Sequence, residues 1–415
     1  MRATGEKSSG DERASAGATD WRRRDFLRLG AIGLGAASCW PLWNGPALAA
    51  PQDGRILVAL ELSGGNDGLN TVVPYGDDAY YRQRPNLGIP KDKLLQLDDH
   101  YGLHASMRGM ERLYKEGKVA IVHGCGYQDP SYSHFTSMSY WHTAAPNSGE
   151  EYGWMGRLSD AMQPRASEAF LINIDATQSL AVRSRVHRPV VFDDPDRFVR
   201  KSTYEQSRAA DYLPASDGLE NPTRRFLVEA ARSARSAAHR VREAWSAYDS
   251  PVDYGLVPLD LPKIVSLIDA KLPTRLYYTT FRNNAFDTHV HQTDLHARLL
   301  TYTADAIAGF MADLKRIGRA DDVTLLVFSE FGRRVPENTN LGTDHGAANN
   351  MFVIGEHVKG GHYGARPSLT ELDPGDNLLY TTDFRRVYAS VIDGWLQVDS
   401  KAVLRDSFPT FDLFG

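Results

Sequence analysis

The sequence contains very little cysteine, because Cys39 and Cys125 are the only two among 415 residues. We predict that residues 1–49 are removed on maturation, for reasons given below, which leaves Cys125 alone. The mature chain then has no internal disulfide, as expected of a protein that folds in a reducing compartment. A lone cysteine is usually a small buried apolar residue, and we expect this of Cys125.

The sequence also lacks a long apolar run and an excess of basic residues. It has 47 Lys and Arg against 52 Asp and Glu, a net charge of −5, and loss of residues 1–49 with seven basic and five acidic residues changes it to −7. This balance excludes the basic surface typical of nucleic-acid binding, so we expect no nucleic-acid partner. The remaining 366 residues are enough for a large core.

The first 49 residues have the order of an export signal. The RRRDFL segment at residues 22–27 precedes an apolar segment at residues 29–40, and ALA at residues 47–49 offers a cleavage site. The paired arginines resemble the twin-arginine consensus, so we predict transient binding to the twin-arginine translocase and a periplasmic or secreted product. We expect no stable membrane anchor, because a spanning helix needs about 20 apolar residues. Acylation of Cys39 is an alternative.

Six short runs of mostly β-branched or aromatic residues predict buried strands. They are continuous rather than alternating, which is typical of a parallel sheet with both faces covered. Residues 106–116, 294–317 and 382–396 have helical patterns between them. This alternation predicts a three-layer α/β fold with a largely parallel central sheet. The predicted strands are residues 56–60, 119–122, 170–174, 276–280, 323–328 and 351–354.

The stretch from about residue 195 to 271 differs from the rest. It is rich in Arg, Ala and Ser, and residues 222–248 have helical periodicity. We interpret it as a helical insertion in a single α/β domain that covers residues 50–415, and we expect it to shape access to the functional site. Its charges are typical of a solvated helix face.

Polar residues gather directly after the predicted strands, where the ligand sites of open α/β sheets form. Asp67 follows the first strand in the segment SGGNDGLN, and by itself it is typical of an Asx turn. Ser131, Ser133 and His134 follow the second strand at the start of a predicted helix. Either serine could be a helix N-cap, but the same position suits a hydroxyl nucleophile or a bound anion.

Carboxylates and imidazoles recur near the later strands. Asp287, His289 and His291 follow the fourth strand, while His296, deeper in the next helix, is interpreted as a solvated or capping residue. Such oxygen and nitrogen donors suit Zn²⁺ and similar cations. Further candidates follow the fifth strand and precede the sixth, so we predict a metal-centred hydrolytic site at one edge of the sheet. They are Glu330, Arg333, Asp344 and His345.

These segments resemble the bacterial domain-of-unknown-function 1501 (DUF1501) family over nearly the whole mature length. That family is grouped with the alkaline phosphatase and sulfatase superfamily, whose members have a mixed sheet, a hydroxyl-type nucleophile and one or two divalent metals. The resemblance therefore implies a three-layer, alkaline-phosphatase-like sandwich. The segments that carry the resemblance are residues 62–74 with GDDAYY at 76–81, 130–135, 286–292, 329–335, 342–346 and 381–388.

The resemblance implies roles for individual residues. Ser133 or Ser131 falls in the region of the nucleophile. The residue after Glu330 is Phe331 rather than histidine, so a second metal lacks a ligand. The nucleophile loop also lacks the cysteine of the sulfatase Cys-x-Pro-Ser-Arg motif, which argues against a formylglycine-dependent sulfatase. The candidate metal ligands are Asp67, Asp287 with His289 or His291, Glu330, Asp344 and His345.

The function that the resemblance implies is hydrolysis of a phosphate or sulfate ester in an anionic small molecule or polysaccharide. The cofactor is then a divalent cation, such as Zn, Mn, Mg or Ca. His134 is the neighbouring acid/base group, and Arg333 or Arg334 clamps the anion, unless these arginines only pair with surface carboxylates. The alternative is a catalytically inactive binding or scaffold protein on the same fold, which Phe331 favours.

Overall fold

The predicted apolar runs form the centre of the main sheet. In this computed structural model, which describes residues 54–198 and 221–415, each of the six runs is a buried strand. The predicted signal region, residues 1–49, lies outside the described residues. The six strands are β1 (Ile56–Leu62), β5 (Val119–Gly126), β6 (Leu171–Ile174), β8 (Leu276–Phe281), β9 (Val323–Phe328) and β10 (Asn349–Ile354).

The main sheet has nine strands within the described residues, in the order β11-β5-β10-β9-β1-β8-β6-β7 with β12 paired to β5. All pairs are parallel except those of β10, which runs antiparallel to β5 and β9. The prediction of a largely parallel sheet is therefore confirmed, with one strand reversed. The other strands are β7 (Val190–Phe192), β11 (Gly361–Tyr363) and β12 (Thr382–Asp383), and in a small second sheet β2 (Val72–Val73), β3 (Leu94–Gln96) and β4 (Gly102–His104).

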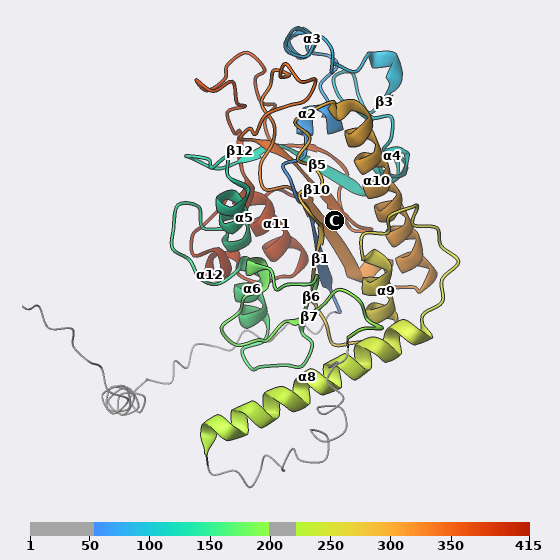
Figure 1. Ribbon diagram of the computed structural model, residues 1–415, viewed down its shortest axis with the longest axis vertical. Coiled ribbons are helices and arrows are strands. Elements are labelled where there is room, and N and C mark those ends of the chain that lie inside the picture. Colours follow the sequence, from blue (N-terminus) through green and yellow to red (C-terminus); the bar gives the residue numbers. More distant parts are fainter. Residues whose placement is uncertain (1–53, 199–220) are drawn as a thin grey trace, which may run out of the picture. The chain divides into compact units, whose positions relative to one another are not determined.

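Helices cover both faces of the main sheet, as Figure 1 shows. Val58 and Leu60 of β1 pack into one hydrophobic core, whereas Leu57 and Ala59 pack into the other. Full burial of each larger side chain stabilises the fold by about 1.5–3 kcal/mol. The predicted three-layer α/β fold is thus confirmed. One face carries α4 (Arg108–Lys115), α9 (Leu261–Asp269) and α10 (Gln292–Arg316), and the other carries α5 (His134–Thr143), α6 (Trp154–Met162), α11 (Phe384–Ser390) and α12 (Ser400–Leu404).

Helix α10 has the periodicity from which it was predicted. Its buried residues Leu300, Ala304 and Ile307 recur at spacings of four and three, which places them on one face of the helix. The remaining helical segments are short. They are α2 (Gly68–Thr71), α3 (Asp78–Gln83), the 3₁₀ turns η1 (Lys91–Lys93), η2 (Leu180–Val182) and η4 (Ala320–Asp322), and the π-helical turn η5 (Val391–Trp395).

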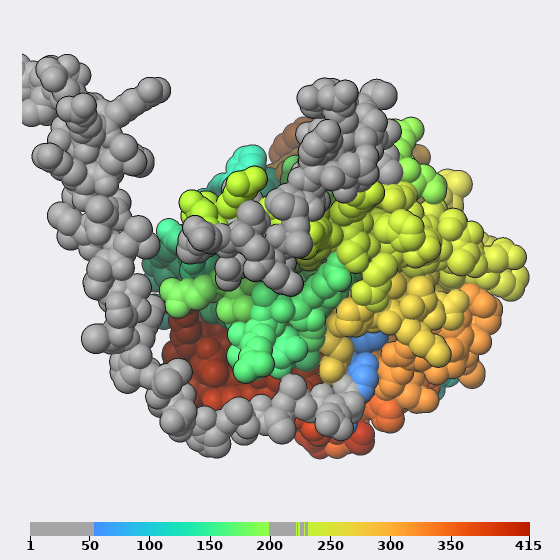
Figure 2. Space-filling view, turned by 90° about the horizontal axis from the view of Figure 1, so that it is seen from below, coloured from blue at the N-terminus to red at the C-terminus, as the bar shows by residue number. Residues whose placement is uncertain are grey.

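The predicted insertion contains the long helix α8 (Pro222–Ala247), while residues 199–220 lie outside the described residues. The Asn221 side chain caps α8 by accepting hydrogen bonds from its first N–H groups. In Figure 1, α8 crosses the lower end of the molecule, away from α2, which follows the carboxyl end of β1. Its yellow-green part of the chain forms a large area of the face in Figure 2. The expectation that the insertion shapes access to the site therefore does not hold for α8.

Two further predictions concern cysteine and the membrane. Cys125 is buried and unpaired, as predicted. Among residues 54–198 and 221–415, no helix is both long and apolar enough to cross a membrane.

Candidate metal centre

Four strands bring side chains to one edge of the main sheet. His134 begins α5 after the carboxyl end of β5, Asp287 follows β8, and Glu330 follows β9. His345 precedes β10, and because β10 is antiparallel to its neighbours, its beginning lies at the same edge as their carboxyl ends. The reversed strand therefore adds residues that precede a strand to the edge where ligand sites of α/β sheets form.

The Asp287 carboxylate lies at the centre of three imidazoles. Its Oδ1 atom is 2.9 Å from His289 Nε2 and 3.0 Å from His345 Nε2, and its Oδ2 atom is 3.4 Å from His134 Nε2. Ligand atoms of His134, Asp287 and His345 all lie within 4.8 Å of one another. Asp287 and these three histidines are called the histidine cluster below.

Each imidazole of the histidine cluster is held through its other ring nitrogen, Nδ1. An oxygen acceptor faces each Nδ1 atom, and in the tautomer with the proton on Nδ1 each Nε2 atom keeps a lone pair for a cation. Without a cation, His345 Nε2 also lies at hydrogen-bond distance, 3.0 Å, from Asp287 Oδ1. Oxygen acceptors in this position orient the histidine ligands of metal sites. The three pairs are His134 Nδ1 with Glu330 Oε1 at 2.7 Å, His345 Nδ1 with the Tyr132 carbonyl oxygen at 2.8 Å, and His289 Nδ1 with Asp344 Oδ1 at 3.4 Å.

In this tautomer, the lone pairs of the imidazole Nε2 atoms face one another and the Asp287 carboxylate. His289 Nε2 and His345 Nε2 are only 3.0 Å apart, and His134 Nε2 is buried with no hydrogen-bond partner among residues 54–198 and 221–415. A zinc-like cation accepts imidazole nitrogen and carboxylate oxygen at about 2.0–2.2 Å, and so satisfies these lone pairs together. The donor set of three nitrogen atoms and one carboxylate therefore fits a divalent metal ion.

Local interactions set the charge of the histidine cluster. Burial favours the neutral form of Asp287, but hydrogen bonds from Arg333 and His345 outweigh it and lower the pKa of Asp287 to about 2. The hydrogen bond to Glu330 raises the pKa of His134, whereas burial lowers the pKa of His345. Asp287 is thus a carboxylate at neutral pH, which is the form that binds a cation.

Arg333 is buried and fixes the position of Asp287. Its Nη2 atom donates to Asp287 Oδ1 at 2.8 Å, and its remaining N–H groups point at backbone carbonyl oxygens and, from Nη1 at 3.4 Å, at His289 Nε2. All three guanidinium nitrogens are therefore engaged by described residues, and Arg333 acts as a positioning residue. The predicted anion clamp would need free N–H groups, which this geometry does not leave. The carbonyl acceptors belong to Gly64, Gly65, Phe286 and Thr343.

Gly64 and Gly65 let the loop after β1 approach the histidine cluster closely. Both have positive φ angles, 115° and 72°, which favour glycine. A Cβ atom on Gly64 would lie 2.5 Å from the Asp287 backbone nitrogen, and one on Gly65 would lie 2.1 Å from the Phe331 ring. The turn and the close approach thus both require glycine at these two positions.

Glu330 and Phe331, which follow β9, both contact His134 of the histidine cluster. Glu330 is completely buried and accepts hydrogen bonds from the Gly64 N–H at 2.8 Å and from the adjacent Ser329 hydroxyl at 3.1 Å. Its bond to His134 makes it a support for that imidazole rather than a direct ligand of the same ion. The Phe331 ring centre lies 4.9 Å from that of His134, so an apolar ring packs where the resemblance implied a second histidine.

Asp67 lies in a separate, buried polar group. Its carboxylate pairs with Arg84 at 2.7 Å and accepts a hydrogen bond from Gln292 Nε2 at 2.5 Å, and Asp67 also caps α2 through the Asn70 N–H. Burial opposes its ionisation, but the charge of Arg84 outweighs burial and lowers the pKa of Asp67. Because Arg84 already neutralises it, Asp67 is not brought into the histidine cluster as the predicted ligand.

The two candidate serines lie next to His134 and differ in their hydrogen bonds. Ser133 is the N-cap of α5, but its side chain makes no capping hydrogen bond. Ser131 Oγ instead accepts a hydrogen bond from the Ser133 N–H at 3.3 Å. The exposed Ser133 hydroxyl is therefore the one that is left available for chemistry.

Two of the histidines that follow the fourth predicted strand, His291 and His296, lie outside the histidine cluster. His291 is exposed and is the N-cap residue directly before α10, with a φ of 45° and no capping hydrogen bond from its side chain. His296 is only 2% exposed, and its Nε2 atom lies 2.9 Å from Asn66 Oδ1. The prediction that His296 is solvated or caps the helix is therefore wrong, because its side of α10 faces the loop after β1.

Sequence analysis missed Arg84 and the Tyr132 carbonyl group. Arg84 follows Asp67 by 17 residues and belongs to no recognisable motif, so no local signal marks it as the partner of Asp67. Tyr132 lies between the two candidate serines, but a backbone carbonyl leaves no trace in a side-chain pattern. Only the tertiary fold reveals either contact.

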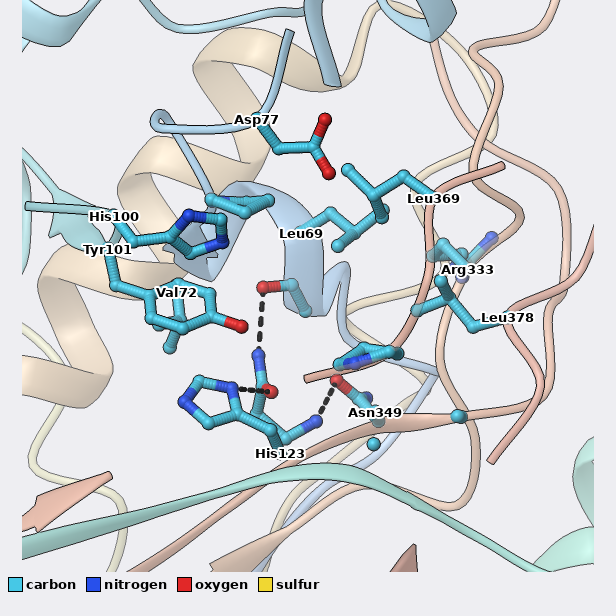
Figure 3. A pocket seen from close by; sticks show the side chains of 16 residues that line it. Leu69, Val72, Asp77, His100, Tyr101, His123, Arg333, Asn349, Leu369 and Leu378 are labelled. Carbon is cyan, nitrogen blue, oxygen red and sulfur yellow. Dashed lines mark hydrogen bonds between the residues drawn. The ribbon is translucent and has the colours of Figure 1, made fainter. Parts of the chain in front are cut away.

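A small cavity adjoins Arg333 on the side of Asn349. Figure 3 shows Tyr101 and His123 on one wall and Leu369 on the opposite wall. The volume in which the centre of a water molecule fits is about 20 Å³, so the cavity holds one or two waters. The cavity is therefore too small for an ester substrate, and the partly exposed histidine cluster is the better candidate site.

The chain is similar to several solved structures at low sequence identity. A protein in the alkaline phosphatase superfamily from Vibrio parahaemolyticus is 11% identical, with 75% of this chain and 62% of that chain covered and a TM-score of 0.35. The lipoteichoic acid synthase LtaP from Listeria monocytogenes is 10% identical, with coverages of 86% and 81% and a TM-score of 0.37. The PsFucS1 sulfatase from Pseudoalteromonas sp. is 11% identical, with coverages of 86% and 70% and a TM-score of 0.37.

No curated protein matches this chain. Residues 274–404, however, match the family described as "Protein of unknown function (DUF1501)". The matched range includes Asp287, His289 and His345 of the histidine cluster, while His134 precedes it. The family predicted from the spaced motifs is thereby confirmed over residues 274–404, the part of the chain that matches DUF1501.

Proposed function

We propose that this protein is an exported, metal-dependent hydrolase of phosphate or sulfate esters. The observation that carries the proposal is the convergence of three imidazole Nε2 atoms on the Asp287 carboxylate, each imidazole being anchored through Nδ1. His134, Asp287, His289 and His345 would hold the ion. Because nitrogen ligands outnumber oxygen ligands, zinc suits this site better than magnesium or calcium.

The bound cation would neutralise charge on the ester oxygens and lower the pKa of a nearby hydroxyl group. Ser133 is the proposed nucleophile, because its hydroxyl is exposed and free of a capping bond at the start of α5. Its oxygen would bond to phosphorus or sulfur as the ester alcohol leaves, and water would then release the acid. The free N–H groups in the first turn of α5 favour an anion at this place.

Metal content and turnover test the proposal together. We expect about one zinc ion per chain and turnover of an aryl phosphate or aryl sulfate ester by the purified protein. Ser133→Ala should lower kcat by about a thousandfold or more with metal content unchanged. Ser131→Ala should lower it less, because the Ser131 hydroxyl only accepts the Ser133 N–H. Ser139→Ala is the control, since this hydroxyl bonds within α5.

A contrary result has a definite meaning. Protein without metal and without turnover would support the alternative of an inactive binding or scaffold protein. Turnover that survives Asp287→Asn combined with His345→Ala would exclude metal catalysis at the histidine cluster.

Export through the twin-arginine translocase is part of the proposal and has its own test. The RRRDFL segment at residues 22–27 and the ALA segment at residues 47–49 support it. Replacing Arg23 and Arg24, the arginine pair that precedes Asp25-Phe26-Leu27, by lysine should retain the protein in the cytoplasm, as measured by cell fractionation. Unchanged export of this variant would contradict the proposed route.

A further inference from the structure

Large apolar side chains are exposed beside the histidine cluster. Among the described residues, four of the eight large exposed apolar side chains lie within four residues of a cluster histidine. Phe135 is 88% exposed, and Val290 is 54% exposed. The other two are Tyr132 and Leu341. Half of these exposed apolar side chains thus lie close to the polar histidine cluster.

Backbone contacts place these side chains on both sides of the cluster. The Tyr132 carbonyl accepts the hydrogen bond of His345, so the segment with Tyr132 and Phe135 borders that imidazole. On the other side, the Gln292 N–H donates to the Leu341 carbonyl at 2.9 Å, which joins the segments of Leu341 and Val290 next to His289. His289 and His345 face each other between the two segments. Tyr132, Phe135, Val290 and Leu341 are called the apolar rim below.

The apolar rim offers few hydrogen bonds. The side chains of Phe135, Val290 and Leu341 have no polar atoms, and the Tyr132 hydroxyl already bonds to Asp373 and Asn377. A sugar ring carries hydroxyl groups that need hydrogen-bond partners when water is removed. An alkyl or aryl group needs none, and it gains free energy in proportion to the apolar area that it buries. The rim therefore suits a hydrocarbon group better than a sugar.

We propose that the substrate is amphiphilic: an ester whose phosphate or sulfate group binds at the histidine cluster and whose alkyl or aryl alcohol packs on the apolar rim. This inference rests on the proposed function and names its substrate class. Exposed apolar side chains that gather in one region mark binding sites, and the rim residues flank a site for an anionic group.

The charge next to the apolar rim argues for a single amphiphile rather than an anionic membrane surface. The segment that binds the Tyr132 hydroxyl contains Glu371, Asp373 and Asp376 and no basic residue, while from outside this segment the single charge of Arg334 also acts on Tyr132. Polybasic segments attract anionic lipid surfaces, whereas this acidic segment repels them. The anionic group of a single molecule can instead enter at the metal centre.

Binding of stable analogues tests this proposal without turnover. Octylphosphonate, methylphosphonate and the two corresponding sulfonates would be titrated calorimetrically into the zinc-loaded protein. The octyl compound with the preferred head group should bind at least about tenfold more tightly than its methyl analogue, since burial of two methylene groups at about 0.8 kcal/mol each gives roughly that factor. Phe135→Ser combined with Val290→Ser should lower this ratio at least threefold.

Leu256→Ser is the matched control for the rim variants. Leu256 is 79% exposed, but its neighbour Gly255 contacts Asp305, 13 residues into α10 and about 20 Å along the helix from its start. This variant should leave the ratio unchanged.

The outcomes separate this inference from the proposed function. Equal affinities of octyl and methyl compounds, both dependent on zinc and on Asp287, would overturn the amphiphilic substrate and leave the hydrolase proposal standing. Octyl binding that persists in Asp287→Ala, or equal binding to neutral lipid vesicles, would make the rim a general apolar or membrane surface and overturn the inference. Absence of zinc-dependent binding by all four compounds would contradict both proposals.

Discussion

Asp67 and Asp287 are both carboxylates near the carboxyl edge of the sheet, and both contact a buried arginine. They differ in what surrounds their oxygen atoms. Asp67 receives the Gln292 amide and the Asn70 N–H besides Arg84, so proton donors surround it. Asp287 receives Arg333 on one side and faces imidazole nitrogens on the other.

This difference shows that the neighbours of a carboxylate decide its role: a carboxylate beside atoms with free lone pairs can share a metal ion with them. Donors around Asp67 complete its hydrogen bonds and stabilise the fold. Around Asp287, Arg333 donates from one side and three imidazole nitrogens face the carboxylate from the other, and a shared proton or a cation completes this arrangement. The two sites should therefore respond differently to substitution, with stability changing at Asp67 and metal binding changing around Asp287.

The largest expected effect is on stability at Asp67. Asp67→Ala leaves the buried Arg84 charge without its carboxylate and should lower the free energy of unfolding by about 3–5 kcal/mol. Asp287→Ala should lower it much less in metal-free protein, because Asp287 is partly exposed and Arg333 keeps its carbonyl acceptors. Urea unfolding of both variants after metal removal measures this contrast. Equal losses would mean that both carboxylates serve only the fold.

A smaller effect is expected from the residues that hold the imidazoles. Glu330→Gln keeps the size of the buried side chain but weakens the charged hydrogen bond to His134, and should lower zinc affinity by about 10- to 100-fold. Asp344→Asn should lower it less, because its bond to His289 is longer, at 3.4 Å, and partly exposed. Zinc competition titrations compare the two. An unchanged zinc affinity in Glu330→Gln would show that Glu330 does not support His134 as a metal ligand.

The smallest effect concerns pH. The pKa of Asp287 is lowered to about 2 in the folded protein, so its stabilising contribution is full above its unfolded pKa of about 3.9 and is lost as pH falls toward 2. After a discount for partial exposure, this contribution is about 1 kcal/mol. Metal-free Asp287→Asn should therefore lose about 1 kcal/mol less than the parent between pH 5 and pH 2 in acid unfolding. If the free energy of unfolding fell equally in the parent and the variant between pH 5 and pH 2, the lowered pKa of Asp287 would be contradicted.

The fold was largely readable from the sequence because its strands are continuous apolar runs. A buried run does not record its direction, however, and the reversal of β10 could not be predicted from residues 351–354. That reversal decides the site, since it carries His345 to the same edge as Asp287. The segments were found from local motifs, while their convergence depends on sheet topology.

Within the site, sequence patterns identified most of the polar residues but not their partners. His134 was expected to act as an acid or base near the nucleophile, whereas its two ring nitrogens face Glu330 and Asp287, 196 and 153 residues away along the chain. Glu330 was expected as a ligand and lies behind that histidine. Pairings over such separations are set by the fold, and no local spacing encodes them.

Anomalous diffraction from zinc-soaked crystals would test the central claim most directly. The account predicts one zinc peak at about 2.0–2.2 Å from Asp287 and from the Nε2 atoms of the histidine cluster, with no peak at Asp67. A peak beside Asp67, or an empty histidine cluster at saturating zinc, would contradict it.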